Sequence, residues 1–338
     1  MNRATRARIV QNAAGALIVT ALVGACGAAI QAPSASQGLP TIGPAATTSA
    51  PVVTPTPTLA PSPSPTPSPT PKPSLHSVTG VTAANTCDPS VVPGSAFAPF
   101  TPGPPPKAKS SALHVPILEY HRIVPIKEAG RSLPHLTMPP EIFAAQMSAL
   151  DKAGWKTITL ATLANDLAAG VVPPAQTFVV TIDDGWWDGY TYAYPILAQH
   201  GFVATFFVIA GRIGNGSFLG PSQIQALAAA GNEIGDHSVH HSWLTALNPK
   251  ALTSEIDSAA ATIAAVTGVW PETLAYPHGA TDTQVMAAVA ACKPLRMAVV
   301  EGHGGTETWA NRYDIARFKI GPHVTGAGLL AEVRSVGH

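Results

Sequence analysis

The chain has 338 residues, and its 19 basic side chains balance its 19 acidic ones. No cluster of basic residues is visible, which argues against nucleic acid as a partner. After a proline-rich N-terminal tract, the remainder is long enough for one good-sized domain with a substantial core.

The first 25 residues have the features of an export signal. Three arginines fall within the first eight residues, and 13–23 form an apolar stretch too short to span a bilayer. The stretch ends in Val-Gly-Ala-Cys at 23–26, which resembles the bacterial lipobox, whose cysteine is lipidated. We expect a lipoprotein signal peptide over 1–25 and a lipid anchor on Cys26, with a plain secretory signal as the alternative. The protein would then be extracytoplasmic, and only the lipid would contact the membrane.

Residues 26–109 form a linker without an expected core. Between about 32 and 73 the chain is mainly Pro, Ser, Thr and Ala, with repeated Ser-Pro and Thr-Pro pairs. Such a tract lacks the large apolar side chains that offset chain entropy, and it favours an extended polyproline II conformation. We interpret it as a disordered spacer that holds a catalytic domain, residues 110–338, away from a membrane.

Beyond residue 110, short apolar runs alternate with helical patterns. The run 177–182 (TFVVTI) is the clearest strand, and 141–153 places Phe143, Met147 and Leu150 on one helix face. The alternation predicts an α/β fold, a parallel barrel of about seven strands. In chain order we predict strands over 115–120, 157–160, 177–182, 204–209, 233–236, 273–276, 297–300 and 317–320, and helices over 141–153, 161–169, 192–199, 222–230, 249–266, 283–291 and 328–333.

Polar side chains directly follow four of these strands. They are His121, the Asp-Asp-Gly run at 183–185, His237 and the Pro-His-Gly run at 277–279. Because active residues of parallel barrels lie at the C-terminal strand ends, we expect these side chains to converge on one mouth.

The spacing of His237 and His241 is compatible with a metal site. If the run 237–241 is helical, both imidazoles project from one face and can bind one ion. Two histidines and a carboxylate, with a position left open for water, form a catalytic zinc arrangement. A histidine-rich surface turn is the alternative, and the neighbouring carboxylates favour the metal site.

Asp183 and Asp184 supply those carboxylates. Adjacent side chains of a strand face opposite ways, so both can reach one site only if the strand ends there. Gly185 permits the sharp turn that this requires. One carboxylate can then bind the metal while the other accepts a proton from water. An ordinary Asp-Asp-Gly turn is the alternative.

Three motifs carry a family resemblance: 181–185 (TIDDG), 237–241 (HSVHH) and 275–279 (AYPHG). In order and spacing they resemble the first three motifs of the polysaccharide deacetylases, the carbohydrate esterase family 4 or NodB-homology group. The run 116–122 (PILEYHR) resembles the start of the branch that includes biofilm poly-N-acetylglucosamine de-N-acetylases. The resemblance covers about 115–333 and implies a distorted (β/α) barrel.

The resemblance also implies a role for individual residues. Asp183 corresponds to the general base, and the ligands of a divalent metal, most simply Zn²⁺, correspond to Asp184, His237 and His241. In the biofilm branch the general acid is a histidine from the N-terminal strand, here His121. The run 320–323 distantly resembles the last family motif, so His323 is the alternative acid.

Two positions depart from the common family pattern. The third motif usually carries an arginine where this chain has Ala275, and an aromatic residue where it has His278. That arginine orients the catalytic aspartate. In the biofilm branch a later arginine takes its place, and the run 315–318 (IARF) looks like its counterpart. We therefore expect Arg317 to orient Asp183.

Several aromatic residues are candidates for substrate binding. Trp186, Trp187 and Tyr190 follow the base immediately, where they could stack on sugar rings or pack against the next helix. Tyr276 and His278 belong to the third motif and are further candidates.

Cys87 and Cys292 remain after the lipobox cysteine is set aside. In an oxidising compartment two such cysteines commonly pair, and a bridge would attach the segment before the domain to the domain itself. Two free thiols are the alternative.

The implied reaction is metal-dependent removal of acetyl groups from an N-acetylglucosamine-containing polysaccharide, either an exopolysaccharide or peptidoglycan. The acetylated polysaccharide would be the partner of a monomeric enzyme. A deacetylase of O-acetyl esters, such as those of xylan, is one alternative. A non-catalytic sugar-binding protein with a decayed site, suggested by Ala275, is another.

Overall fold

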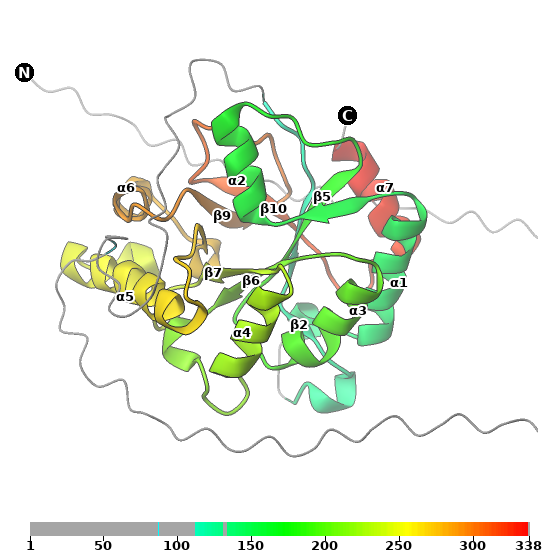
Figure 1. Ribbon diagram of the computed structural model, residues 1–338, viewed down its shortest axis with the longest axis horizontal. Coiled ribbons are helices and arrows are strands. Elements are labelled where there is room, and N and C mark those ends of the chain that lie inside the picture. The colour runs from blue at the N-terminus through cyan, green and yellow to red at the C-terminus, as the bar shows by residue number, and fades with distance from the viewer. Residues whose placement is uncertain (1–86, 88–111, 131–133, 337–338) are drawn as a thin grey trace, which may run out of the picture. The chain divides into compact units, whose positions relative to one another are not determined.

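The computed structural model describes Cys87, residues 112–130 and residues 134–336. The expected signal peptide, Cys26 and almost all of the linker lie outside the described residues. The described part contains a closed barrel of seven parallel strands (Figure 1), as the sequence predicts. β1 pairs with β5 on one side and with β10 on the other, which closes the barrel. In barrel order the strands are β1 (Ile117–Tyr120), β5 (Thr177–Ile182), β6 (Thr205–Val208), β7 (Glu233–Asp236), β8 (Thr273–Ala275), β9 (Met297–Gly302) and β10 (Ile315–Lys319).

An eighth parallel strand, β4 (Lys156–Ile158), distorts the barrel. It pairs with the first half of β5, from Thr177 to Val179, while β6 pairs with the second half of the same edge. β4 therefore lies beside the barrel wall rather than in it. β2 (Arg122–Ile123) and β3 (Thr137–Met138) form a separate short pair.

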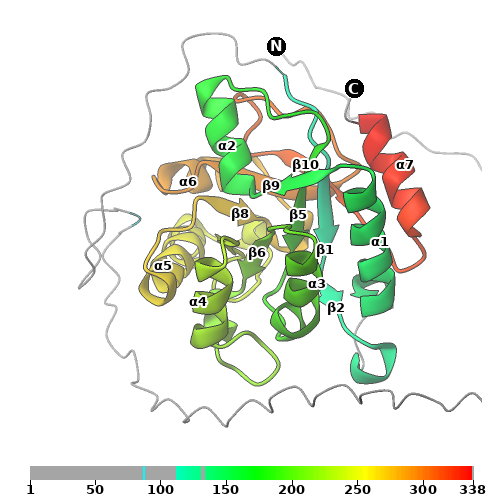
Figure 2. The same cartoon turned by 45° about the vertical axis from the view of Figure 1, so that its right-hand side comes forward.

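Seven α-helices surround the barrel within the described residues, and α1 and α7 lie side by side in Figures 1 and 2. Side-chain oxygens of Thr159, Asn248 and Asp282 cap the starts of α2, α5 and α6. None of the described helices is long and apolar enough to cross a membrane. The helices are α1 (Pro140–Lys152), α2 (Leu160–Ala169), α3 (Tyr194–Gln199), α4 (Pro221–Ala229), α5 (Pro249–Thr267), α6 (Thr283–Ala291) and α7 (Gly326–Val336).

Each predicted strand and helix is present, with bounds that either coincide with the predicted ones or differ by at most three residues. The largest local difference precedes α3, where a single π-helical turn, Gly189–Ala193, occupies the start of the predicted helix. The strand β10 begins at Ile315, two residues before its predicted start, so Arg317 lies in the middle of the strand.

The two faces of each strand have different surroundings. Outward-facing residues such as Leu118 and Val180 pack with Phe143 of α1 in one large apolar cluster. Inward-facing residues such as Ile117 and Val179 pack with Leu163 and neighbouring residues of α2. Because side chains alternate along a strand, the interior face continues from this apolar layer to Glu119 on β1, and to Thr181 and Asp183 along β5. The barrel interior is thus apolar at one end and charged at the other.

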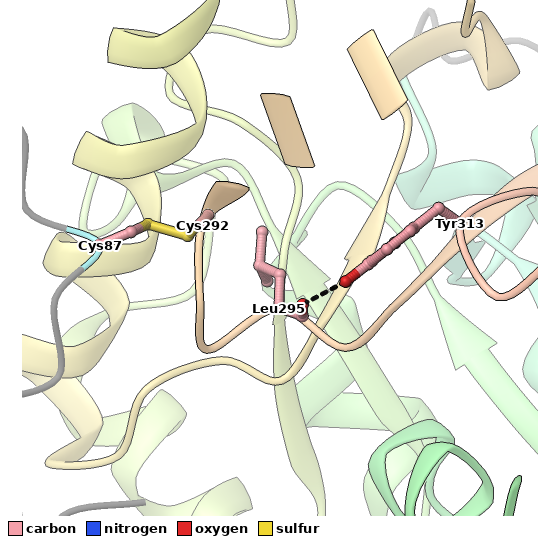
Figure 3. The surroundings of a disulfide bond; sticks show 4 residues. All are labelled: Cys87, Cys292, Leu295 and Tyr313. Atoms are coloured by element: carbon pink, nitrogen blue, oxygen red, sulfur yellow. Dashed lines mark hydrogen bonds between the residues drawn. A yellow bond between two sulfur atoms is a disulfide. The ribbon is translucent and has the colours of Figure 1, made fainter. Parts of the chain in front are cut away.

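The predicted Cys87–Cys292 disulfide is present (Figure 3), and the two Cα atoms are 4.9 Å apart. Both cysteines are buried among apolar side chains beside α5 and α6. Nearby, the hydroxyl of Tyr313 donates a hydrogen bond of 3.0 Å to the carbonyl of Leu295. The disulfide therefore fixes a residue of the preceding segment to the outer layer of the domain.

Glu307 is a buried carboxyl near the apolar end of the barrel. Its Oε2 accepts a hydrogen bond of 3.0 Å from the backbone N–H of Val115, and its backbone pairs with Leu113. Burial raises the pKa of Glu307 to about 7. The folded state therefore holds this proton more tightly than the unfolded chain does, and the stability contributed by Glu307 is lost as the pH rises towards 7.

Glu307→Gln should raise the free energy of unfolding at pH 8 by up to about 3 kcal/mol, and much less at pH 5. The amide keeps an acceptor for Val115 and removes the cost of a buried charge. Urea unfolding at the two pH values measures the difference. Glu141→Gln, on the exposed face of α1, is the matched control and should change stability by less than about 0.5 kcal/mol. An equal effect of Glu307→Gln at both pH values would contradict the assignment.

Candidate metal and catalytic site

A cavity of about 240 Å³ opens at the carboxyl ends of the barrel strands. Eight of the predicted site residues line it: His121, Asp183, Asp184, His237, His241, Tyr276, His278 and Arg317. The other lining residues are Glu119, His135, Leu136, Trp243, Gly279, Glu301 and Lys319. The expected convergence of strand ends on one mouth is therefore found.

Asp183 and Asp184 directly follow β5, and their carboxylates point in different directions. The backbone N–H of Asp183 still bonds to the carbonyl of Tyr120 on β1, so this residue continues the strand. Asp184 and Gly185 then have φ values of 72° and 70°, which ends the strand in a sharp turn. A Cβ atom on Gly185 would lie 3.1 Å from Val208, so glycine fits both the turn and the close packing.

Asp183 points into the barrel and is held there by Arg317. Nη1 and Nη2 of Arg317 donate to Oδ1 and Oδ2 of Asp183, both at 2.7 Å. Nη1 also donates to the hydroxyl of Thr181 at 2.9 Å. Burial raises the pKa of Asp183, but the charge and hydrogen bonds of Arg317 lower it more, so the net shift is downward. Asp183 is therefore ionised and fixed in orientation.

Glu119 is a second buried carboxyl beside the same guanidinium. Its Oε2 lies 3.2 Å from Nη2 of Arg317, but this atom makes no hydrogen bond within the described part of the chain. Its Oε1 lies 3.9 Å from Nδ1 of His121. Burial raises the pKa of Glu119, and Arg317 opposes that shift. Arg317 therefore hydrogen-bonds to Asp183, and Glu119 lies between Arg317 and His121.

Asp184 faces the two histidines of the second motif. Its Oδ1 is 3.6 Å from Nε2 of His237 and 3.5 Å from Nε2 of His241. Zinc bonds of about 2.0–2.1 Å at tetrahedral angles would separate donor atoms by roughly 3.3 Å. Both distances from Oδ1 of Asp184 are therefore close to this spacing, and the donor atoms of all three residues lie within 4.8 Å of one another.

The run 237–241 is a loop, so the helical arrangement considered above is wrong. Oδ1 of Asp236 accepts a bond of 2.7 Å from the N–H of Ser238, and the Ser238 hydroxyl oxygen accepts one of 2.9 Å from the N–H of His241. Such local side-chain acceptors compete with helical hydrogen bonds. Ser238 and His241 both have φ near 60°, and this turn brings the two imidazoles to Asp184.

The protonation states of the cluster suit metal binding. Nδ1 of His237 lies 2.7 Å from the carbonyl oxygen of Ala275, which can only accept, so Nδ1 carries a proton and Nε2 is the atom left to bind an ion. Burial lowers the pKa of His237, but the carboxylates of Asp184 and Asp183 raise it more, so an ion at Nε2 competes with a proton. Burial and the neighbouring His237 lower the pKa of His241 to about 4, so this ring is neutral at pH 7. Burial raises the pKa of Asp184, but the histidines lower it far more, which leaves an anion.

A second cluster, Glu119, His121 and Asp183, also has donor atoms within 4.8 Å of one another. Both oxygens of Asp183 already accept bonds from Arg317, and a cation bound there would face the guanidinium at close range. Like charges at such distances repel strongly in a buried site. The donor set of Asp184, His237 and His241 therefore fits a divalent ion better.

Trp186 contacts the cluster through a bond that the sequence did not indicate. Its indole N–H donates to Oδ2 of Asp184 at 3.0 Å, while its ring stacks on Phe218 with centroids 4.3 Å apart. Trp187 lies against Tyr192, and Tyr190 stacks on Tyr194. None of these three candidates lines the cavity. Because the indole N–H of Trp186 bonds to Oδ2 of Asp184, the other oxygen, Oδ1, faces the two histidines.

The remaining candidates differ in their exposure. Tyr276 is buried, and its hydroxyl donates to the carbonyl of Tyr313 at 2.9 Å. His278 is exposed at the mouth, and its Nε2 donates to the carbonyl of His241 at 3.2 Å. His323 is exposed but is not part of the cavity lining, whereas His121 is.

Trp186→Phe should lower the affinity for Zn²⁺ about 10-fold or more, because Asp184 loses the donor that fixes its second oxygen. Phenylalanine keeps the stacking on Phe218, so the melting temperature should change little. Competition with a chromophoric chelator measures the affinity. Trp187→Phe is the matched control, because its indole does not reach Asp184. Equal zinc affinities for Trp186→Phe and the wild type would contradict the proposed contact.

Comparisons with known proteins agree with this geometry. A family model described as polysaccharide deacetylase matches residues 170–295. The putative polysaccharide deacetylase YxkH of Bacillus subtilis is 28% identical over 222 residues, which are 66% of this chain and 77% of that protein. The peptidoglycan-N-acetylglucosamine deacetylase PgdA of Listeria monocytogenes is 27% identical over 145 residues, and the match spans only 29% of its length.

Solved structures share the fold at low sequence identity. The Streptococcus pyogenes deacetylase PplD superimposes with a TM-score of 0.61 at 24% identity, covering 66% of this chain and 99% of that one. IcaB from Ammonifex degensii gives a TM-score of 0.57 at 19% identity, covering 68% and 100%. Together, the motifs, the barrel and the family model identify a polysaccharide deacetylase domain of the NodB-homology group in this chain, and deacetylating hydrolases are among its relatives.

Proposed function

We propose that this protein is a zinc-dependent enzyme that removes N-acetyl groups from N-acetylglucosamine units of a polysaccharide. The observation that carries the proposal is the separation of two adjacent carboxylates. Asp183 is bound to Arg317, and Asp184 is directed at two histidine nitrogens. This separation assigns a base and a metal ligand to neighbouring positions in the chain.

The chemistry divides between the two clusters. A divalent ion held by Asp184, His237 and His241 would polarise the acetyl carbonyl and make water more acidic. Asp183 then takes the proton of the attacking water, and Arg317 keeps the carboxylate aimed at it. His121 donates a proton to the departing sugar nitrogen, so that an amine and acetate leave.

The support for His121 as the acid is its position. It lines the cavity, and its ring nitrogen is within 4.8 Å of a carboxylate oxygen of Asp183. His323 has no comparable contact with the cavity. Glu119, at 3.9 Å from Nδ1, would orient the His121 ring.

The substrate class rests on the names of relatives. PgdA is named for peptidoglycan N-acetylglucosamine, and chitin deacetylase 2 from two varieties of Cryptococcus neoformans matches at 26% identity. The basic start, the apolar stretch and the lipobox-like run ending at Cys26 support export and a lipid anchor. We therefore propose an enzyme anchored by lipid to the membrane, outside the cytoplasm, that acts on cell-envelope or exported glycans.

The purified protein should release acetate from N-acetylglucosamine oligomers, and a chelator or Asp183→Asn should abolish the release. Acetate is measured by a coupled enzymatic assay. Metal-dependent release from acetylated xylan alone would replace the amide substrate with an ester. Zinc binding without release from either substrate would favour the sugar-binding alternative.

Arg317→Lys should move the acidic limb of the kcat/KM profile to higher pH. A lysine ammonium lacks the planar fork that makes paired bonds to both oxygens of Asp183, so the pKa of this buried carboxyl rises relative to the wild type and the base is protonated over a wider acidic range. The value of kcat at the optimum should fall about 10-fold or more. Unchanged zinc content and circular dichroism are the controls, and an unshifted acidic limb would count against the role of Arg317.

A further inference from the structure

A row of aromatic rings leads from the metal cluster to the molecular surface. The rings of His237 and His241 lie 4.8 Å apart, and those of His241 and His278 lie 4.4 Å apart. The indole of Trp243 then stacks on His278 with centroids 4.3 Å apart and an interplanar angle of 9°. Trp243 is the outermost ring of this row, and it also lines the cavity.

The exposure of Trp243 has no structural explanation in the packing. The residue is 56% exposed, and it is the only aromatic side chain among the large apolar residues that are strongly exposed in the described part of the chain. One face of the indole covers His278, so the exposed area is largely the opposite face and the edge. An exposed tryptophan beside a functional cavity is costly to solvate and is typical of binding surfaces.

The stack is held rigidly in place. His278 has φ of 61° in a tight turn, and its ring nitrogen bonds to the carbonyl of His241. The next residue, Gly279, has φ of 63°, and a Cβ atom there would lie 2.8 Å from Glu301. The turn therefore fixes the imidazole on which Trp243 rests, and the platform formed by Trp243 and His278 needs little ordering when a ligand binds.

The size of the cavity indicates what would occupy this platform. At about 240 Å³ it is below the range of about 300–1,000 Å³ that drug-sized ligands fill. It can accept the acetamido group and its own sugar ring, while neighbouring sugars of a polymer must lie on the rim. The C–H face of a pyranose ring is apolar and flat enough to stack on an indole.

We propose that the exposed face of Trp243 is a binding subsite for a sugar ring adjacent to the one being deacetylated, so that the enzyme prefers polymeric over single-sugar substrates. This proposal rests on the proposed function. In this proposal Trp243 determines the preference for longer substrates and takes no part in the chemical step.

The test compares Trp243→Ala with Trp243→Phe, which keeps a flat ring, in the purified full chain loaded with Zn²⁺. Trp243→Ala should lower kcat/KM for an N-acetylglucosamine pentamer about 3- to 10-fold, mainly through KM. Turnover of a one-ring N-acetylglucosamine glycoside and of a small aryl acetate should stay within about 2-fold. Trp243→Phe should retain most of the activity on the pentamer.

Each other outcome overturns the proposal in a recognisable way. Equal losses on long and short substrates, or a lower affinity for Zn²⁺, would make Trp243 a support for His278 and His241. If the wild type is active and Trp243→Ala is equally active on the pentamer, the subsite proposal is wrong and the proposed function still stands. A wild type that releases no acetate from any of these substrates would overturn the proposed function and the subsite together.

Discussion

The buried guanidinium of Arg317 is the interaction on which the site depends. It lies inside the barrel, 2% exposed, with two bonds of 2.7 Å to Asp183 and Glu119 3.2 Å away. Neither carboxylate could remain charged in this interior without a cation, because burying an unpaired charge costs several kcal/mol. The pair also turns Asp183 away from the histidines and leaves Asp184 as the carboxylate that faces them. Arg317 faces inward on β10, two residues beyond Ile315 in the apolar layer. Because side chains alternate along a strand, this position places the guanidinium in the barrel interior, next to Asp183.

The loops that follow the strands hold the rest of the site in strained conformations. Five described residues other than glycine have positive φ, and four of them belong to the site: Asp184, Ser238, His241 and His278. Such conformations cost about 1–3 kcal/mol each, and they persist where the surrounding structure determines them. Here the bonds from the N–H of Ser238 to Asp236 and from His278 to the carbonyl of His241 hold the backbone in these conformations. The barrel strands thus hold the ends of the turns in place, and the strained turns direct the metal-binding side chains towards one another.

The sequence predicted the barrel and the residues at its mouth, because both follow from short-range patterns. Apolar runs define the strands, and the residues that end them must meet at one end of a parallel barrel. The local geometry could not be predicted in the same way. The spacing of His237 and His241 suited a helix, but side-chain acceptors at Asp236 and Ser238 produce a loop with the same result. Trp186 was a candidate for stacking on sugar rings or for packing against the next helix, and only the packing on Phe218 directs its N–H at Asp184. Glu119 could have been found, since it lies on β1 two residues before His121. The position of Trp243 depends on a tertiary stack with His278, which no sequence pattern indicates.

The most direct test of this account is the zinc affinity of Asp183→Asn and Asp184→Asn, measured by titration calorimetry beside the turnover of each variant. If Asp183 is the base and Asp184 the ligand, Asp183→Asn binds one equivalent of Zn²⁺ with nearly wild-type affinity and loses turnover at least about 100-fold. Asp184→Asn then binds Zn²⁺ at least about 10-fold more weakly. Equal losses of zinc affinity in the two variants would contradict the account, because both carboxylates would then be ligands and Arg317 would not separate their roles.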